Sequence, residues 1–434
     1  MSQLIQTTDN NRDGLTVVDE AYLADLNKMA EKPIAQLDLD DNTNLLIFPQ
    51  DLDYWGDKIG KEHIFEMDGN CLKTGNIMGF IGYHDTKVKI GSRFEQKGKD
   101  FFLHYMLQKV FAINLFDLKY DSDEESVFDF LIYFFPVFLK RALRQGLYKE
   151  YQTRRYNDAN VRGFINVNRH IQRNTPFIGK VAYSTREYAT DNHVVQLIRH
   201  TIDYISSLAY SGNILNNDDE TKDAVSVINS ATPTYNKHER RKVINQNLQP
   251  VRHPYFSEYR PLQRLCLQIL RHEELKYGRD DEQIYGILFD GAWLWEEYLN
   301  TFLYPILSHP QNRLGRGKKY LFKYPLSGIC YPDFYNQQMV IDAKYKGYAD
   351  WTNIQREDLY QVITYMHVLN LSHGGFIVPC KKDKKELPNK QLNGIGGTMA
   401  VFGMQVDFAS DSYLEYCSKM EMSEQNLKEL IECS

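Results

Sequence analysis

The stretch 331–346, with the sequence YPDFYNQQMVIDAKYK, constrains the fold of this chain more than any other. Two short runs of strand-forming residues flank the polar segment 336–338, a pattern that predicts a β-hairpin. Asp333 falls on the first strand. Asp342 and Lys344 fall two residues apart on the second, so their side chains leave the same face. Because Asp342 follows an apolar run typical of a buried strand, its charge needs a paired partner or a metal ion.

These residue types suit metal-assisted hydrolysis of a phosphodiester. A divalent cation such as Mg²⁺ prefers hard oxygen ligands, and Asp333, Asp342 and the backbone carbonyl of Ala343 supply three of them. Lys344 is placed to position and deprotonate the attacking water and to offset charge on the phosphate. The alternative interpretation is a surface hairpin that carries a solvated Asp–Lys pair.

The letters PD at 332–333, followed by DAK at 342–344, resemble the PD-(D/E)xK nuclease motif. Residues 353–371 place apolar side chains at helical spacing, which predicts a helix after the hairpin. Gln361 and Tyr365 lie one turn apart on it. Gln-x-x-x-Tyr on this helix resembles an additional motif of the same class of nucleases, and the resemblance implies that Gln361 orients the site.

Two neighbouring segments extend this pattern. The letters GFIVP at 375–379 predict a short buried strand after the helix, and residues 284–307 predict a helix before the hairpin. A glutamate on the first helix often completes the metal site in this class. Glu296 is the candidate and Glu297 its solvated neighbour, although an ordinary helical glutamate explains Glu296 almost equally well. The order of elements predicts a restriction-endonuclease-like α/β core.

The bulk properties of the chain limit its class. A length of 434 residues exceeds one typical core and predicts several α/β domains. The net charge of −6 means that a nucleic-acid enzyme of this composition must localise its positive charge. Six scattered cysteines without a CxxC spacing argue against a zinc ribbon or an iron–sulfur cluster. The apolar run 127–139 is too short to span a bilayer, and no signal peptide is evident, so we expect a cytoplasmic protein without membrane contact.

Positive charge is concentrated in the segment 140–180, which holds ten Lys and Arg residues against two acidic ones. A second basic cluster lies at 237–242, and the glycine-containing segment 315–319 is interpreted as a basic loop near DNA. The candidates for DNA contact are Arg154, Arg155, Arg162, Lys318 and Lys319. This composition suits phosphate contacts, but a face that binds a partner protein or solvent explains the segment 140–180 equally well.

Segments outside the nuclease motif resemble McrC, the nuclease subunit of McrBC-type modification-dependent restriction systems. The letters LYKEYQTRRYNDANVRGFI at 147–165 resemble its Leu…Tyr…Arg-Gly segment, and residues 181–202 resemble the segment that follows. Residues 76–94 alternate in β fashion and predict a hairpin with its turn at 83–86. Its part 82–94 resembles the N-terminal signature of the family. Here the letters GSR at 91–93 replace a family Pro-Lys pair, which is a departure. The resemblance covers most of residues 75–380.

The resemblance implies a division of labour between two chains. In that family a separate McrB-like AAA+ GTPase oligomer recognises modified DNA and translocates it. The N-terminal part of the nuclease subunit docks on this GTPase and stimulates its hydrolysis. The present sequence contains no GxxxxGK[ST] phosphate loop, so we expect it to bind no nucleotide itself. The expected cofactor is Mg²⁺, and the expected partners are the GTPase oligomer and double-stranded, modified DNA.

These patterns predict three regions. Residues 1–125 are expected to form an α/β region that docks on the GTPase, residues 126–250 a helical and basic region with possible DNA contacts, and residues 251–434 the nuclease domain. The expected function is an Mg²⁺-dependent DNA endonuclease subunit of a restriction or phage-defence system. Two alternatives stay open: a stand-alone repair or defence nuclease of the same fold, and a scaffold that mainly activates the GTPase.

Overall fold

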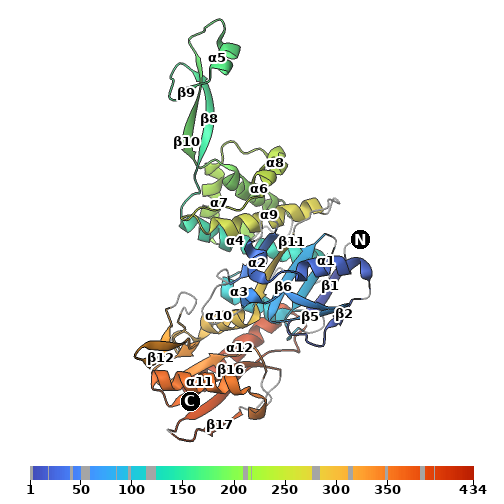
Figure 1. Cartoon of the computed structure of the whole chain (residues 1–434), viewed down its shortest axis with the longest axis vertical. Coiled ribbons are helices and arrows are strands. Elements are labelled where there is room, and N and C mark those ends of the chain that lie inside the picture. The colour runs from blue at the N-terminus through green and yellow to red at the C-terminus, as the bar shows by residue number, and fades with distance from the viewer. Residues whose placement is uncertain are drawn as a thin grey trace. The chain divides into compact units, whose positions relative to one another are not determined.

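The structure is a computed structural model, and its chain divides into two compact units, Met1–Val127 with Asp280–Ser434 and Phe128–Arg279. Figure 1 shows the chain coloured from its N-terminus to its C-terminus. The residues that the structure describes are 3–17, 19–39, 43–49, 59–84, 86–95, 99–113, 124–208, 214–216, 218–275, 284–310, 316–347, 350–381, 387–394 and 396–434. Each unit is a mixture of helices and strands, which confirms the expected α/β class.

One five-stranded sheet of the first unit joins strands that are far apart in the sequence. β11 (Ile284–Asp290) lies between β6 (Ile77–Tyr83), which runs antiparallel to it, and β3 (Thr43–Phe48), which runs parallel to it. β7 (Thr86–Gly91) pairs antiparallel with β6 and parallel with β1 (Gln3–Thr8). The β6–β7 pair confirms the hairpin predicted near residue 84. All seven residues of β11 are buried, as expected for a central strand.

The helix predicted over 284–307 is wrong in its first part. Residues 284–290 form β11, and the helix α10 begins at Gly291 and ends at Leu303. A short apolar run does not distinguish a buried strand from a buried helix, because periodicity is informative only where one face is polar. The side chain of Asp290 accepts a hydrogen bond from the backbone N–H of Ala292 at 2.9 Å and so caps α10.

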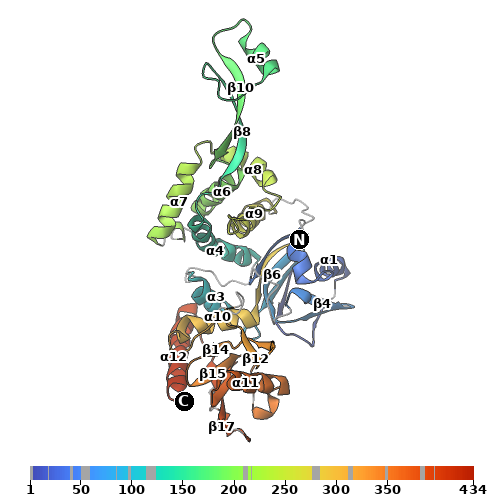
Figure 2. The ribbon, with the colours of Figure 1, turned by 60° about the vertical axis from the view of Figure 1, so that its left-hand side comes forward.

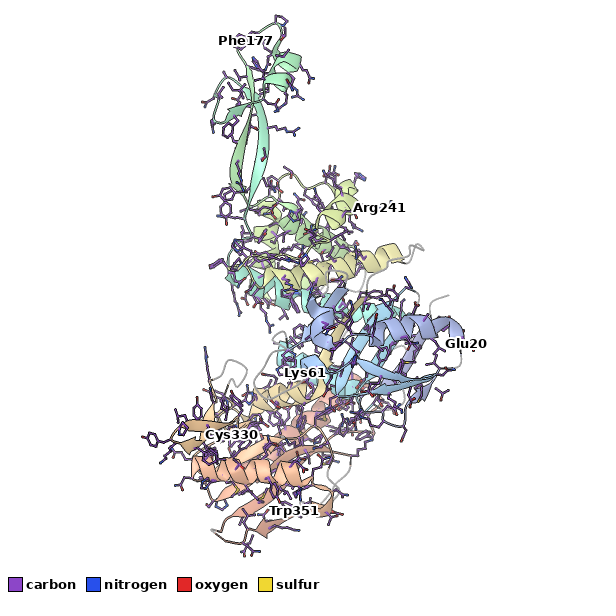
Figure 3. All side chains as sticks on the ribbon, viewed as in Figure 1. Glu20, Lys61, Phe177, Arg241, Cys330 and Trp351 are labelled. Atoms are coloured by element: carbon purple, nitrogen blue, oxygen red, sulfur yellow. The ribbon has the colours of Figure 1, made fainter. Side chains whose placement is uncertain are left out.

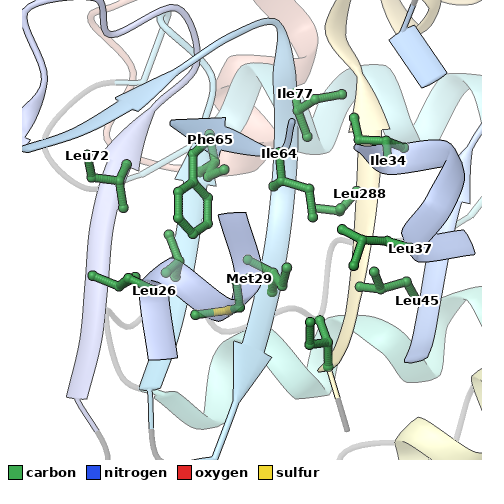
Figure 4. Close-up of a cluster of buried hydrophobic side chains, with 14 of the residues drawn as sticks. Leu26, Met29, Ile34, Leu37, Leu45, Ile64, Phe65, Leu72, Ile77 and Leu288 are labelled. Atoms are coloured by element: carbon green, nitrogen blue, oxygen red, sulfur yellow. The ribbon is translucent and has the colours of Figure 1, made fainter. Parts of the chain in front are cut away.

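A hydrophobic core fills the space beside this first sheet. It is covered by α1 (Glu20–Ala30), α2 (Ile34–Leu39) and a small antiparallel sheet of β2 (Leu15–Thr16), β5 (Cys71–Thr74) and β4 (Phe65–Asp68). Figure 4 shows the core side chains that these elements share with the large sheet, among them Leu26, Met29, Ile34, Leu37, Leu45, Ile64, Phe65, Leu72, Ile77 and Leu288.

The second five-stranded sheet of the first unit has the order β14–β15–β16–β18–β17. The strands β15 (Met339–Ala343), β16 (His373–Cys380) and β18 (Thr398–Gln405) are parallel, whereas β14 (Phe334–Tyr335) and β17 (Leu387–Gln391) are antiparallel edge strands. This order of strands is compatible with the restriction-endonuclease-like core expected from the sequence.

Helix α11 (Arg356–Leu369) connects β15 to β16, as the helical spacing of residues 353–371 predicts. Its apolar side chains Val362 and Met366 pack against Val340 and Phe376 of the sheet. A two-stranded ribbon of β12 (Lys319–Lys323) and β13 (Leu326–Cys330) precedes β14 in the chain. Short 3-10 helices lie at Ile59–Lys61, Ile214–Asn216, Lys237–Glu239 and Trp351–Asn353.

Three helices join the two sheets of the first unit. α3 (Phe101–Phe111) packs against α10, and α12 (Tyr413–Glu432) packs against both α3 and β18. The buried carboxylate of Glu424 on α12 accepts hydrogen bonds from Tyr105 Oη of α3 and Tyr298 Oη of α10, each at 2.8 Å. A buried charge is tolerated when it is hydrogen-bonded, so Glu424 ties the three helices together.

The second unit is a helical body that carries an arm. The body consists of α4 (Glu124–Arg144), which begins in the first unit, and of α6 (His193–Ser207), α7 (Asp219–Ala231), α8 (Arg240–Gln246) and α9 (Tyr259–Leu275). Part of α4 is the apolar run with Pro136 inside it, and the side chains of Leu131, Phe134, Phe135 and Phe138 are buried. Among the described residues, no helix has the length and apolar character that a membrane crossing requires.

The arm consists of β8 (Glu150–Asp158), which pairs antiparallel with β10 (Val181–Ala189) over nine residues. β9 (Phe164–Ile165) and α5 (Val167–Asn174) lie between these strands in the sequence. The arm extends away from the helices of its unit, and α5 lies at its far end (Figures 1 and 2).

The structure divides the chain differently from the three regions that the sequence suggests. Residues 251–279 lie in the second unit, because α9 packs on α6. Residues 1–127 and 280–434 form one unit, because β11 is inserted between β6 and β3. The N-terminal region and the nuclease region are therefore one body.

Candidate active site

The candidate site lies on the hairpin of β14 and β15. The register Phe334↔Ile341 places Asp333, which directly precedes β14, beside Asp342 on β15. The backbone N–H of Ala343 donates to Asp333 Oδ2 at 2.9 Å, which holds the half-buried Asp333 side chain against β15. The side chain of Asp342 is fully buried. The predicted hairpin is therefore confirmed, and it brings the two aspartates together.

Lys344 lies at the centre of the site. Its Nζ is 2.8 Å from Asp342 Oδ2 and donates to Gln361 Oε1 at 3.0 Å. Its backbone N–H donates to the carbonyl oxygen of Ile377 at 3.0 Å, which continues the β15–β16 ladder by one residue. The ammonium is thus held by the hairpin and by α11 at once, and its position is well defined.

Gln361 and Tyr365 lie on the face of α11 that points to the site. Gln361 Nε2 donates to Tyr365 Oη at 2.7 Å. Since an Asn or Gln amide has one acceptor oxygen and one donor nitrogen, this bond orients Gln361 Oε1 toward Lys344. The two residues of the Gln-x-x-x-Tyr motif therefore belong to one series of contacts, which runs from Tyr365 through Gln361 and Lys344 to Asp342.

Burial governs the electrostatics of the site. Burial raises the pKa of Asp333 well above its ordinary value, and the adjacent Asp342 charge raises it further. Burial also raises the pKa of Asp342, although Lys344 opposes this effect. Burial on its own lowers the pKa of Lys344, but the carboxylates of Asp342, Asp333 and Asp358 together outweigh it, so the pKa of Lys344 is raised. The site holds one cation against two carboxylates that repel each other.

The donor set fits a divalent metal ion. In the described part of the chain, the carboxylate of the buried Asp342 contacts only the side chains of Lys344 and Asp333, and no backbone N–H donates to it. Buried carboxylates require a paired charge or a metal, and Asp333 beside Asp342 supplies a second hard oxygen ligand of the kind that Mg²⁺ prefers.

Glu296 is not brought into this group as a third acidic ligand. It lies half-buried on α10, and its neighbour Glu297 accepts a hydrogen bond from Trp293 Nε1 at 3.2 Å. Within the described ranges, no three His, Cys, Asp or Glu side chains gather closely enough to hold a metal ion. The assignments of Glu296 and of the Ala343 carbonyl as metal ligands stay predictions.

The five basic residues predicted to contact DNA lie in different units. Arg154 and Arg155 are on β8 of the arm and Arg162 follows it, all in the second unit. Lys318 and Lys319 are at the start of the β12–β13 ribbon in the first unit. Only the second group is adjacent in the chain to the candidate site. Contact of either group with DNA stays a prediction.

Sequence reasoning missed three residues around the site. Asp358 on α11 is buried and lies 3.5 Å from Lys344 Nζ and 2.7 Å from Lys346 Nζ. Its position three residues before Gln361 was a usable signal, since residues at that spacing share a helix face. His309 Nδ1 lies 2.8 Å from the carbonyl oxygen of Asp333. The third residue, Arg93, contacts the backbone of Tyr345 from the other sheet, and local sequence offers no signal for it.

Comparison with known proteins decides the family. The sequence profile described as "McrBC 5-methylcytosine restriction system component" matches residues 72–379, which is more than half of the chain. The chain belongs to the McrBC family. The resemblance to McrC inferred from the sequence is thereby confirmed. No curated protein gives a significant match to this McrBC-family chain.

One solved structure agrees with this family at the level of the fold. A chain of the assembly of Thermococcus gammatolerans McrB AAA+ hexamers with bound McrC has a TM-score of 0.51 at 14% identity, and the match covers 98% of this chain and 100% of that chain. A chain of the cryo-EM structure of the McrBC complex of the same organism is 14% identical, covers 70% of this chain and 88% of that chain, and has a TM-score of only 0.30. The first match shows a shared fold for this McrBC-family chain.

Proposed function

We propose that this chain is an endonuclease subunit that hydrolyses the phosphodiester bonds of double-stranded DNA with Mg²⁺ as its cofactor. One observation carries the proposal: the Nζ atom of Lys344 is held 2.8 Å from the buried Asp342 and donates to Gln361 at 3.0 Å. A buried acid–ammonium pair next to a second, half-buried acid is costly for stability. Such a costly group of ionisable side chains marks a candidate site of chemistry.

Asp333 and Asp342 are the side chains that would hold the ion, together with the carbonyl of Ala343. When bound, Mg²⁺ would supply Lewis-acid chemistry at the phosphate and the attacking water. The chain itself supplies the fixed carboxylates: Asp333 is held by the N–H of Ala343 and Asp342 by the strand that carries it. Their mutual repulsion is relieved by a cation, which favours metal binding over an empty site.

Lys344 acts as a cation in this proposal. Its ammonium offsets charge on the phosphate and orients the attacking water. Gln361 positions Lys344 through its oxygen, and Tyr365 positions Gln361.

We further propose that the chain works with a separate AAA+ GTPase oligomer on modified DNA. Two points support this. The family description names a 5-methylcytosine restriction system, and the solved assembly of matching fold holds McrC bound to McrB AAA+ hexamers. The chain also lacks a phosphate loop of its own. In this proposal the AAA+ GTPase of the restriction system is therefore a separate chain.

The arm of the second unit offers the surface for this partner. Its outer part exposes large apolar side chains, with Phe164 87% exposed and Phe177 at its far end (Figure 3). Ile165, Val167 and Ile178 are exposed beside them. Contiguous exposed apolar side chains mark interaction sites. We therefore place the contact with the GTPase on the arm, and not on residues 1–125 as the sequence suggests.

Plasmid cleavage with purified components tests the proposal. The full chain is assayed with Mg²⁺ and modified plasmid DNA, alone and with the co-encoded AAA+ protein and GTP. Asp342→Ala is the matched variant. Cleavage only in the complete wild-type mixture is the expected result. Cleavage by the chain alone shows a stand-alone nuclease. GTP turnover that rises in a mixture that never cuts shows an activator without nuclease activity.

A further inference from the structure

The β12–β13 ribbon is a basic element beside the candidate site. Residues 316–330, which include the ribbon, contain four basic side chains and no acidic one, although the whole chain has a net charge of −6. The basic residues are Arg316, Lys318, Lys319 and Lys323. Localised positive charge on an acidic protein attracts polyanions, so this ribbon differs in character from the average surface of the chain.

Apolar side chains at the tip of the ribbon are exposed. Tyr324 is 95% exposed at the turn, and Phe322 and Leu326 beside it are 57% and 64% exposed. These three side chains cover none of the described core of their own unit. An exposed apolar cluster of this kind, set among basic residues, indicates a binding surface.

The base of the ribbon is fixed at the site. Lys319 pairs with Cys330, and Asp333 follows only three residues later. β12 packs against α11, the helix that carries Gln361, and Lys319 Nζ lies 5.3 Å from the ring centroid of Tyr335 on β14. A five-residue strand spans about 17 Å. The tip therefore extends from a fixed base beside Asp333.

We propose that the β12–β13 ribbon grips the DNA duplex next to the phosphate that is cut. Lys319 and Lys323 contact phosphates, and the tip around Tyr324 enters a groove. Two-stranded ribbons and apolar side chains both enter DNA grooves. The inference rests on the proposed nuclease function, and it adds the element that seats the substrate and the residues that do so.

The charge of the ribbon favours DNA over the two other possible occupants. Lysine is depleted in protein–protein interfaces, whereas residues 316–330, which include the ribbon, carry three lysines and an arginine without an acidic residue. A second copy of the chain joined through this surface by a two-fold axis would place the same basic residues opposite one another, and that contact is repulsive. Duplex DNA matches both the positive charge and the apolar tip.

The test is DNA binding by the full chain without Mg²⁺, measured by fluorescence anisotropy on a labelled duplex at several salt concentrations. Lys319→Ala with Lys323→Ala is expected to weaken binding and to lower the salt slope by about 2, since each phosphate contact contributes about 0.9. Phe322→Ser with Tyr324→Ser is expected to weaken binding by about tenfold and to leave the salt slope unchanged, because an apolar contact releases no counterions.

Matched controls separate these effects from general changes of charge or surface. Lys28→Ala removes a surface lysine on α1 of the same unit, and Tyr255→Ser removes an exposed tyrosine of the second unit. Both controls are expected to bind DNA as the wild type does. Sedimentation of each ribbon variant is expected to give the wild-type mass.

Unchanged DNA affinity in both ribbon variants overturns the inference. A fall in mass with unchanged affinity assigns the ribbon to contact between copies, and lost GTPase stimulation with unchanged affinity assigns it to the AAA+ partner. Since binding is measured without cleavage, the result does not depend on the nuclease activity. A wild-type chain that binds DNA through the ribbon but never cuts contradicts the proposed function, and of the inference only the contact between ribbon and DNA then stands.

Discussion

Arg93 donates a hydrogen bond from Nη1 to the backbone carbonyl oxygen of Tyr345 at 3.1 Å, across 252 positions of sequence. Tyr345 directly follows Lys344, so this bond joins the first sheet to the candidate site. Arg93 is held in turn by Asp9, which accepts from Arg93 Nε at 2.8 Å. Ser92 Oγ lies 2.7 Å from Tyr345 Oη and adds a second link. The position of Lys344 therefore depends on the N-terminal strands as well as on its own hairpin.

Removal of Arg93 is expected to be costly for stability. Arg93→Ala leaves the buried carboxylate of Asp9 without its cation, and breaking a buried pair in this way costs about 3–5 kcal/mol. The measurement is the free energy of unfolding in urea. Asp9→Asn in the Arg93→Ala background is the control, and it is expected to recover part of the loss. Equal stability of Arg93→Ala and the wild type would contradict the described link.

Asp342→Ala is expected to abolish cleavage and to leave the fold intact. The metal site loses one of its two carboxylates, and a metal-dependent step relies on several kcal/mol of stabilisation, so the rate falls by about 10³ or more. Thermal unfolding with and without Mg²⁺ provides a second readout. The wild type is expected to gain stability when Mg²⁺ binds, whereas the variant is not. Normal cleavage by the variant would remove Asp342 from the site.

Gln361→Ala is expected to slow cleavage by about tenfold, because Lys344 Nζ loses the acceptor that directs it. Tyr365→Phe is the matched comparison. It removes only the hydroxyl that accepts from Gln361 Nε2, so its effect is expected to be smaller. Single-turnover cleavage rates at saturating DNA measure both variants. A larger loss in Tyr365→Phe than in Gln361→Ala would reverse the proposed order of contacts.

Asp100 gives the stability of the chain a dependence on pH. Burial and the neighbouring Glu95 charge raise the pKa of Asp100 to about 7 in the folded state, whereas an unfolded aspartate titrates near 3.9. Between these values the folded chain binds more protons than the unfolded chain. The free energy of unfolding therefore falls as the pH rises from about 4 to about 7, by an amount on the order of a few kcal/mol.

Urea unfolding at several pH values between 5 and 8 measures this slope. Asp100→Asn has no carboxylate to titrate at this position, so its slope is expected to be shallower than that of the wild type. Asp219→Asn, at a side chain that is 95% exposed, is the control and is expected to keep the wild-type slope. An unchanged slope in Asp100→Asn would show that another group titrates.

The local elements of the candidate site were predictable because their residues are close in sequence. Asp333 and Asp342 are nine positions apart on one hairpin, and alternation along a strand determines which side chains share a face. Gln361 and Tyr365 are one helical turn apart, so helical spacing alone predicts that they are neighbours. Periodicity carries this information without knowledge of the rest of the fold.

The segment 284–290 shows where such reasoning fails. The apolar run at 284–290 has no polar face, so its periodicity did not distinguish a strand from a helix. We predicted a helix there, but the run forms the buried strand β11. The strand pairs with β6 and β3, whose residues lie about 200 or more positions earlier. Glu296 lies on the helix that follows this strand, so its position depends on the pairing of β11 with β6 and β3. Local sequence patterns contain no information about that pairing.

The sequence by itself determined the family, the hairpin with its two aspartates and Lys344, and the helix that carries Gln361. Each of these depends on residue types at short, fixed spacings. Only the tertiary structure decided that residues 1–127 and 280–434 form one unit. It also decided that Asp358 contacts Lys344 and that Arg93 contacts the backbone of Tyr345. The exposure of the β12–β13 ribbon beside the site is a third such feature. These features come from contacts between segments that are distant along the chain, where burial and strand pairing, and not local periodicity, choose the partner.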